Sequence, residues 1–188
     1  MSITPDLDAR FRARAAKEHL LDVAYDFTDS PVGPLLVATT ERGLCRVSFD
    51  PEPDRELDEL ARLHGTRVLR SAHPLDDVRR ELDEYFDHLR TTFDLRVDVA
   101  GLPAFQRQVL TELARVPYGE VATYGGLATK IGKPRAARAV GGALNRNPIP
   151  IVVPCHRIVG STGSLVGYAG GLERKRTLLG LEGAILPD

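Results

Sequence analysis

A cysteine and a histidine stand side by side at residues 155 and 156, directly after a proline. A thiolate is the nucleophile of cysteine chemistry, and a nearby imidazole can take the thiol proton directly or through one water. The β-branched residues 151–153 predict a short buried strand, which Pro154 ends because proline cannot donate to a strand ladder. Cys155 and His156 are therefore a candidate nucleophile and base, while a buried structural cysteine beside a surface histidine is an equal alternative.

The composition is that of a soluble globular protein with room for one large domain or two small ones. The chain has 188 residues, of which 43% are hydrophobic and 27% are charged. Its two cysteines form neither a disulfide framework nor a complete cysteine-based zinc site, and no apolar run approaches the ~20 residues of a membrane span. Acidic and basic residues interleaved at the start exclude a signal peptide. We therefore expect a cytoplasmic protein that uses no metal and no cofactor.

Charge divides unequally between the two halves of the sequence. Residues 1–100 contain 14 Lys and Arg against 21 Asp and Glu, a net of −7, whereas residues 101–188 contain 11 against 5, a net of +6. An acidic half joined to a basic half indicates that only the second half meets a polyanion. Two ordinary domains with unequal surfaces would give the same numbers.

The pattern of the first half predicts a small α+β domain without visible chemistry. Alternation predicts an antiparallel meander, and spaced apolar residues predict helices. The expected helices cover residues 5–20, 57–63 and 78–89, and the expected strands cover residues 23–27, 35–38, 44–49 and, at an edge, 94–99. Cys45 has no second ligand at metal spacing, so a core position is favoured over a metal site. His64, His73 and His88 stand in polar surroundings and are expected in solvent.

Helices dominate the second half of the chain. They are expected at residues 103–117, 124–131, 135–145 and 173–181. Pro103 suits the start of the first helix, and Gly132 ends the second. The second and third helices about this tight turn match a helix-turn-helix. A glycine-rich loop at 160–171 precedes the last helix, and a boundary just before Pro103 gives domains at 1–101 and 102–188.

The helix expected at 135–145 contains the adjacent glycines Gly141 and Gly142, which should cost roughly 1 kcal/mol each relative to alanine. Missing side chains let a helix backbone approach another surface closely, and Arg135 and Arg138 place cations on or near the same face. Close packing between helices would explain the small residues but not the arginines. Contact with DNA accounts for both features.

Short segments follow one another through the second half in a recognisable order. They are Tyr118-Gly119-Glu120-Val121, Thr123-Tyr124, Ala136-Ala137-Arg138-Ala139-Val140-Gly141, Asn147-Pro148-Ile149, Pro154-Cys155-His156-Arg157 and Gly167-Tyr168-Ala169-Gly170-Gly171. In order and spacing this set resembles the motifs of the O6-alkylguanine-DNA alkyltransferases, the methylated-DNA–protein-cysteine methyltransferases. The resemblance covers residues 103–183, and the turn at residues 29–33 matches the family's first N-terminal turn.

The resemblance implies an α+β protein with an N-terminal ribonuclease H-like α/β domain and a C-terminal winged helix-turn-helix domain that holds the cysteine. It implies that the partner is double-stranded DNA bearing O6-alkylguanine. We also expect a monomer in solution and, because no apolar run is long enough, no membrane partner. The small-residue helix would enter the minor groove, whose ~6 Å width admits a slim element and whose degenerate code suits repair at any sequence. The residues expected at the DNA are Tyr124, Arg135, Ala137, Arg138 and Gly141.

The resemblance also implies a reaction. An alkyl group would move from guanine O6, or from O4-alkylthymine, to Cys155 after the nucleotide has rotated out of the duplex, and Arg138 would fill the vacated space. Each molecule would act once, because no residue or cofactor here could hydrolyse the thioether.

The resemblance assigns roles around that cysteine. His156 would take the thiol proton through a water, and Glu182 would hold the imidazole in its useful tautomer, although an exposed acid is an alternative for Glu182. Asn147 would bond near the cysteine, and Tyr124 would donate toward guanine N3. The base pocket would be formed by Ile158, Tyr168, Ala169 and Gly170, with backbone groups donating and accepting.

The sequence departs from some relatives and leaves rival functions open. It has no Trp in the region 105–115, and it lacks the Cys/His set with which some relatives bind zinc. A non-catalytic lesion binder of the alkyltransferase-like kind would lack Cys155. A winged-helix regulator fused to a cysteine-rich zinc domain would need that domain, and a cysteine hydrolase would not need the basic half.

Overall fold

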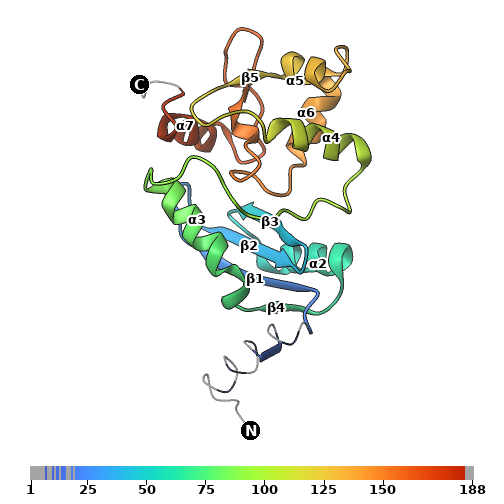
Figure 1. Cartoon of the computed structure of the whole chain (residues 1–188), viewed down its shortest axis with the longest axis vertical. Coiled ribbons are helices and arrows are strands. Elements are labelled where there is room, and N and C mark those ends of the chain that lie inside the picture. Colours follow the sequence, from blue (N-terminus) through green and yellow to red (C-terminus); the bar gives the residue numbers. More distant parts are fainter. Residues whose placement is uncertain are drawn as a thin grey trace. The chain divides into compact units, whose positions relative to one another are not determined.

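The computed structural model describes residues 20–184 together with Leu7, Arg10, Arg12, Arg14, Ala15 and Glu18. The chain divides into two compact units, Met1–Asp98 and Val99–Asp188, and Figure 1 labels most of their elements. The helix expected at residues 5–20 falls largely outside the described residues. No helix in the described part is both long and apolar enough to cross a membrane.

The N-terminal unit is built on a four-stranded sheet in the order β3-β2-β1-β4. Its elements are β1 (Val23–Thr28), β2 (Leu35–Thr40), β3 (Gly43–Phe49), α2 (Pro53–His64), β4 (Val68–Arg70), the 3-10 helix η1 (His73–Leu75) and α3 (Asp76–Phe86). Antiparallel pairing of β1, β2 and β3 confirms the predicted meander. The short strand β4 is not predicted, and it pairs parallel to β1. A parallel neighbour needs a crossover, which α2 supplies.

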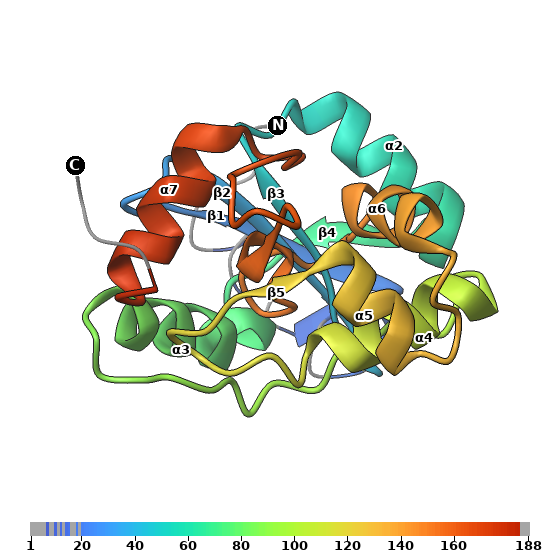
Figure 2. The same ribbon diagram turned by 90° about the horizontal axis from the view of Figure 1, so that it is seen from above.

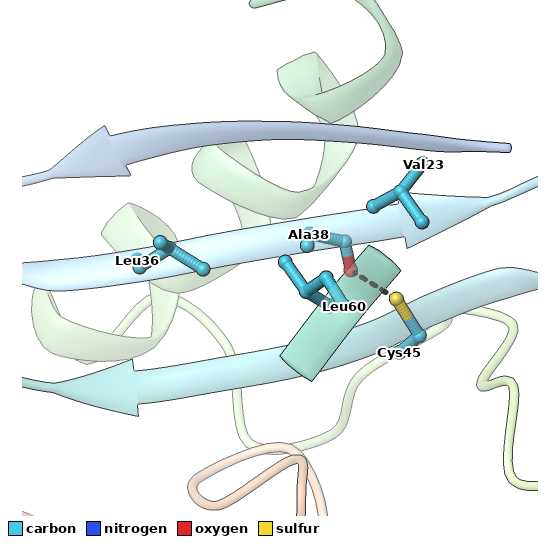
Figure 3. Close-up of a cluster of buried hydrophobic side chains, with 5 residues drawn as sticks. All are labelled: Val23, Leu36, Ala38, Cys45 and Leu60. Atoms are coloured by element: carbon cyan, nitrogen blue, oxygen red, sulfur yellow. Dashed lines mark hydrogen bonds between the residues drawn. The ribbon is translucent and has the colours of Figure 1, made fainter. Parts of the chain in front are cut away.

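One core cluster of this unit lies between the sheet and α2. Val23, Leu36, Ala38, Cys45 and Leu60 are all buried there (Figure 3). The Cys45 thiol donates to the carbonyl of Ala38 at 3.3 Å. Burial, with the charge of Asp98, raises the pKa of this thiol to about 12. The prediction that Cys45 is a small core residue is therefore confirmed.

Two predictions for this unit are wrong. Residues 94–99 form no strand, and only a single parallel bridge joins Leu44 to Val97. His64 is half-buried rather than solvated, because the end of α2 places its Nδ1 4.0 Å from Oδ2 of Asp98. That carboxylate is itself buried and accepts hydrogen bonds from the side chains of Thr40 and Arg42.

Helices α4, α5 and α6 lie side by side in the C-terminal unit (Figure 2). The elements are α4 (Ala104–Leu113), β5 (Ala122–Thr123), α5 (Tyr124–Lys130), α6 (Ala137–Asn145), the 3-10 helix η2 (Cys155–Arg157), β6 (Ile158–Val159) and α7 (Leu172–Leu181). Thr123 caps α5 by accepting from the Gly126 amide at 3.0 Å. The mixture of helices and strands in the two units confirms the predicted α+β class, and α5 and α6 about their short turn match the predicted helix-turn-helix. Helix α4 ends at Leu113, short of Pro117.

The strand predicted at residues 151–153 is wrong. These residues form a turn, and Ile151 has a φ of 73°. A β-branched residue is strained in this left-handed region, so the surroundings must impose it. Ile151 is fully buried, which shows that its hydrophobicity fits the core while its backbone serves a turn.

The regular strand of this region starts after the cysteine. Strand β6 pairs in parallel with β5, joining Ala122 to Ile158 and Thr123 to Val159. Because β5 leads directly into Tyr124 and β6 follows directly from η2, this two-residue pairing brings the start of α5 and the segment of Cys155 to the same place.

Candidate active site

A pocket of about 510 Å³ lies in the C-terminal unit. It is lined by Tyr124, Ala137, Arg138, Gly141, Gly142, Leu144, Asn145, Cys155, Val166, Gly167, Tyr168 and Ala169. The predicted nucleophile, two predicted base-pocket residues, and the predicted DNA-contact residues other than Arg135 therefore share one cavity. Cys155 is only 7% exposed, so a reactant reaches its sulfur through the pocket.

The turn before the cysteine is held by the side chain of Asn147. Its Nδ2 donates to the carbonyl of Val153 at 2.8 Å and to Sγ of Cys155 at 3.2 Å. Its Oδ1 accepts from the backbone of Ile149 at 3.1 Å. One amide thus fixes both sides of the turn and points a donor at the sulfur.

Burial raises the pKa of the Cys155 thiol to about 11, although the Asn147 hydrogen bond, backbone donors and the charge of Lys175 all act in the opposite direction. At neutral pH the sulfur therefore carries its proton. Nucleophilic attack needs a base that removes this proton when a substrate is in place.

Behind the cysteine, His156, Arg157 and Glu182 form a buried cluster. Nε2 of His156 lies 2.9 Å from Oε1 of Glu182. Arg157 donates to both oxygens of the same carboxylate, each at 2.8 Å. Glu182 is 5% exposed, which excludes the exposed-acid alternative. Although burial opposes ionisation, the hydrogen bonds from His156 and Arg157 outweigh it and lower the pKa of Glu182 to about 2.

The cluster determines which nitrogen of His156 carries the proton. Burial lowers the pKa of His156, against the hydrogen bond and charge of Glu182, so the imidazole is neutral at neutral pH. An ionised carboxylate can only accept, so Nε2 is the protonated nitrogen. Nδ1 is then the lone-pair nitrogen, and it is buried without a hydrogen-bond partner in the described part of the chain. A neutral imidazole with an unengaged lone pair can accept a proton.

Lys175 ties the loop before α7 to the strand that follows the cysteine. This lysine is fully buried, and its Nζ donates to the carbonyl of Ile158 at 2.5 Å and to that of Val166 at 2.8 Å. The hydroxyl of Tyr124 lies 3.2 Å from the same Val166 carbonyl and 3.1 Å from that of Gly167. Two donors from different helices therefore hold the loop over the pocket.

Helix α6 presents small residues and a cation to the pocket. A Cβ added to Gly141 would stand 3.6 Å from the Tyr124 ring, and one added to Gly142 would stand 3.7 Å from Arg146. Both are ordinary van der Waals distances, so no neighbour within the chain requires glycine at these positions. The alternative that close internal helix packing selects the glycines is thereby excluded for the described neighbours. Arg138 is exposed at the pocket wall.

Asn147, His156 and Glu182 lie behind the cysteine rather than in the pocket lining, and three of the residues predicted to contact DNA or the base do not line the pocket either. Arg135 precedes α6, which begins at Ala137 rather than at residue 135. Ile158 is fully buried and offers a carbonyl that already accepts from Lys175. The carbonyl of Gly170 accepts from Arg174 at 3.1 Å.

Arg157 and Lys175 belong to this site, but sequence reasoning gave neither a role. Arg157 lies inside the motif next to His156, where a cation looks like a surface residue. Lys175 is one of three consecutive cations at 174–176. Its spacing from the buried Leu178 and Leu179 places it on the apolar face of α7. Helical periodicity could therefore have identified Lys175, whereas nothing in the sequence singles out Arg157.

Comparison with known proteins places these features in a family. Residues 104–184 match the family described as 6-O-methylguanine DNA methyltransferase, DNA binding domain, and residues 23–99 match 6-O-methylguanine DNA methyltransferase, ribonuclease-like domain. The methylated-DNA–protein-cysteine methyltransferase of Methanosarcina barkeri is 44% identical over 158 residues, covering 84% of this chain and 96% of the relative. The crystal structure of Mycobacterium tuberculosis OGT in complex with DNA is 39% identical with a TM-score of 0.75, covering 86% of this chain and 93% of that one.

Proposed function

Because the chain belongs to the family of 6-O-methylguanine DNA methyltransferases, we propose that it repairs DNA by moving the alkyl group of O6-alkylguanine onto its own Cys155. The observation that carries the proposal is a nearly buried cysteine, with an amide donor on its sulfur, in the wall of a pocket of about 510 Å³. Such a volume lies within the ~300–1,000 Å³ of small-molecule sites, so it suits one base rather than a duplex. The exocyclic oxygen of O4-alkylthymine presents the same chemistry.

The proton of the thiol moves first. It passes from Cys155 to Nδ1 of His156 through a water, because Nδ1 has no direct partner among the described residues. The sulfur then attacks the alkyl carbon, and the S–C bond forms as the C–O6 bond breaks. The departing guanine takes up one proton, so thiol and O6-alkylguanine become thioether and guanine. When a base is bound, the O–H of Tyr124 would turn from the loop carbonyls to guanine N3 and disperse the charge on the leaving base.

The target base reaches the pocket by rotation out of the duplex. The reacting carbon of a stacked guanine is inaccessible to the sulfur of a residue that is only 7% exposed, and extrusion costs a few kcal/mol. Arg138 stands at the pocket wall on α6 and is the side chain that would occupy the vacated space. The small residues Ala137 and Gly141 let α6 lie close to a minor groove, which is ~6 Å wide.

The product is a thioether, which water does not cleave. Each molecule therefore accepts one alkyl group and is consumed. One copy suffices for one lesion, since all of the residues assigned to the reaction lie in one chain. Two free thiols, Cys45 and Cys155, suit a reducing compartment such as the cytoplasm.

Mass spectrometry of the intact protein tests the proposal. After incubation with a duplex containing O6-methylguanine, the protein should gain the mass of one methyl group and no more, and peptide mapping should place it on Cys155. Excess lesion should leave unrepaired DNA equal to the lesion added minus the protein present. Repeated turnover, or binding to the lesion without any mass gain, would overturn the proposal.

A further inference from the structure

Arg157 is buried, and all three nitrogens of its guanidinium donate hydrogen bonds, unlike those of a typical surface arginine. It is 6% exposed. Its Nε and one terminal nitrogen bind the two oxygens of Glu182, and its other terminal nitrogen donates to the carbonyl of Val116 at 2.6 Å. The ring of Tyr118 lies 5.9 Å from its guanidinium carbon. This arginine is therefore fixed in position and aimed at one carboxylate.

The same carboxylate also contacts His156, the general base of the proposed reaction. Glu182 accepts from Nε2 of His156 and from Arg157 at once. The charge of Lys175 on α7 also acts on this imidazole, the Cys155 thiol precedes it in η2, and Tyr118 on the loop after α4 feels the charges of Glu182 and Arg157. With Arg157 positive, Glu182 negative and His156 neutral, the three-residue cluster has no net charge. A buried cluster without net charge avoids the large cost of an uncompensated ion.

We propose that Arg157 is a positioning residue that acts through Glu182 to keep Nδ1 of His156 unprotonated and ready to accept the Cys155 proton. This inference rests on the proposed function. It assigns to the guanidinium a role in the proton transfer, in addition to its packing, although it touches neither the thiol nor the base.

Removing the guanidinium leaves His156 and Glu182 alone with one excess negative charge in a buried site. Either the imidazole takes a second proton, or the carboxyl takes one and donates it to Nε2. In the first case Nδ1 is protonated because imidazolium carries protons on both nitrogens. In the second, Nδ1 is protonated because the neutral tautomer is reversed. Both outcomes remove the lone pair from Nδ1.

The first test is the pH dependence of methyl transfer from duplex DNA under single-turnover conditions with saturating protein. In Arg157→Gln the acidic limb of the rate should move up by about one pH unit, which is about a tenfold loss at pH values on that limb. Arg157→Lys keeps a cation but loses the two-point contact, so an intermediate shift is expected. Arg115→Gln, which removes an exposed arginine paired with Glu112, is the matched control and should leave the profile unchanged.

A double variant separates this role from a merely structural one. In Arg157→Gln combined with Glu182→Gln, the negative charge is gone and the amide oxygen can still accept Nε2–H. The acidic limb should then return toward that of the unaltered protein, even though the three hydrogen bonds of the guanidinium are lost. A purely structural arginine predicts that the double variant is worse than the single one at every pH, and that result would overturn the inference.

Nitrogen NMR of the histidines provides a readout that needs no activity. At pH values on the acidic limb, the protonated fraction of Nδ1 of His156 should be larger in Arg157→Gln than in the unaltered protein. Equal protonated fractions in the two proteins contradict the inference, whether or not the variant transfers methyl groups. Failure of the unaltered protein to gain a methyl group contradicts the proposed function instead, so the two failures are distinguishable.

Discussion

The two units each bury one cysteine, and the two sulfurs differ in their surroundings. Both thiols have raised pKa values, about 12 for Cys45 and about 11 for Cys155, and burial is the main cause in each case. Cys45 donates its S–H to a strand carbonyl inside an apolar cluster, whereas Cys155 receives a hydrogen bond from Asn147 in the wall of a pocket. Burial alone therefore does not distinguish a packing residue from a nucleophile.

The direction of the hydrogen bond and the sign of the nearby charge make the difference. A carbonyl that accepts from sulfur stabilises the thiol, while an N–H that donates to sulfur stabilises the thiolate. The charge with the largest effect on the pKa of Cys45 is that of Asp98, which opposes ionisation. The charge acting on Cys155 is that of Lys175, which favours ionisation. Cys155 therefore needs only a base and a substrate, whereas Cys45 lies in a buried core cluster and the largest charge effect on it opposes ionisation.

The largest expected difference is between the two cysteine-to-alanine variants. Cys155→Ala should abolish methyl uptake while the protein stays folded. Cys45→Ala should retain the full methyl gain and lose about 1 kcal/mol of stability, because a buried side chain is truncated. Intact mass after incubation with methylated duplex and a denaturant titration measure the two effects. Methyl uptake by the Cys155→Ala protein would mean that Cys155 is not the acceptor of the methyl group.

Lys175→Met tests the charge side of the comparison. The carbonyls of Ile158 and Val166 lose their charged donor, and each buried acceptor left unpaired costs about 1–3 kcal/mol. We expect a loss of about 2 kcal/mol in the free energy of unfolding and slower transfer at saturating DNA, because the loop over the pocket is released. The neighbouring exposed Arg176→Met serves as the control for stability. Equal stability of the two variants would contradict the role given to Lys175.

The sequence predicts elements better where local pattern and tertiary use agree. Alternation along β1, β2 and β3 and apolar spacing along α2, α3 and α7 identify those elements, with errors only at their ends. The strand expected at 151–153 fails because Ile151 is β-branched and buried yet has a left-handed backbone. Only the hydrogen bonds of Asn147 across the turn and the packing around it can impose that conformation.

In the candidate site, too, local motifs predict some residues, and tertiary contacts that the sequence does not reveal determine the others. The pocket contains Cys155, Tyr124 and Arg138, which the motif resemblance identifies, and His156 does meet Glu182. The second partner of Glu182, Arg157, cannot be predicted from the sequence, because no local pattern distinguishes a buried arginine from a surface one. The same holds for the hydrogen bonds of Lys175, whose partners are backbone carbonyls and so leave no trace in residue type.

Asn147→Ala tests the hydrogen bond that separates the two sulfurs. Without the amide donor, the pKa of Cys155 should rise further, and each pKa unit lowers the thiolate population about tenfold. Asn147→Asp should act in the same direction and more strongly, because it places a negative charge beside the sulfur. The rate of Cys155 alkylation by iodoacetamide against pH measures the shift. A rate that matches the unaltered protein in both variants would remove the hydrogen bond from the explanation.

Gly141→Ala produces the smallest expected effect and tests why the helix at the pocket is slim. The added Cβ would stand 3.6 Å from the Tyr124 ring, so the folded protein accommodates it. Alanine should therefore raise stability by about 0.5–1 kcal/mol, as in other helices. The same methyl group would intrude between α6 and the minor groove, so affinity for duplex DNA should fall a few-fold. Thermal unfolding and DNA titration at fixed salt measure both changes. Higher stability with unchanged affinity would show that neither the fold nor DNA binding requires a glycine at this position.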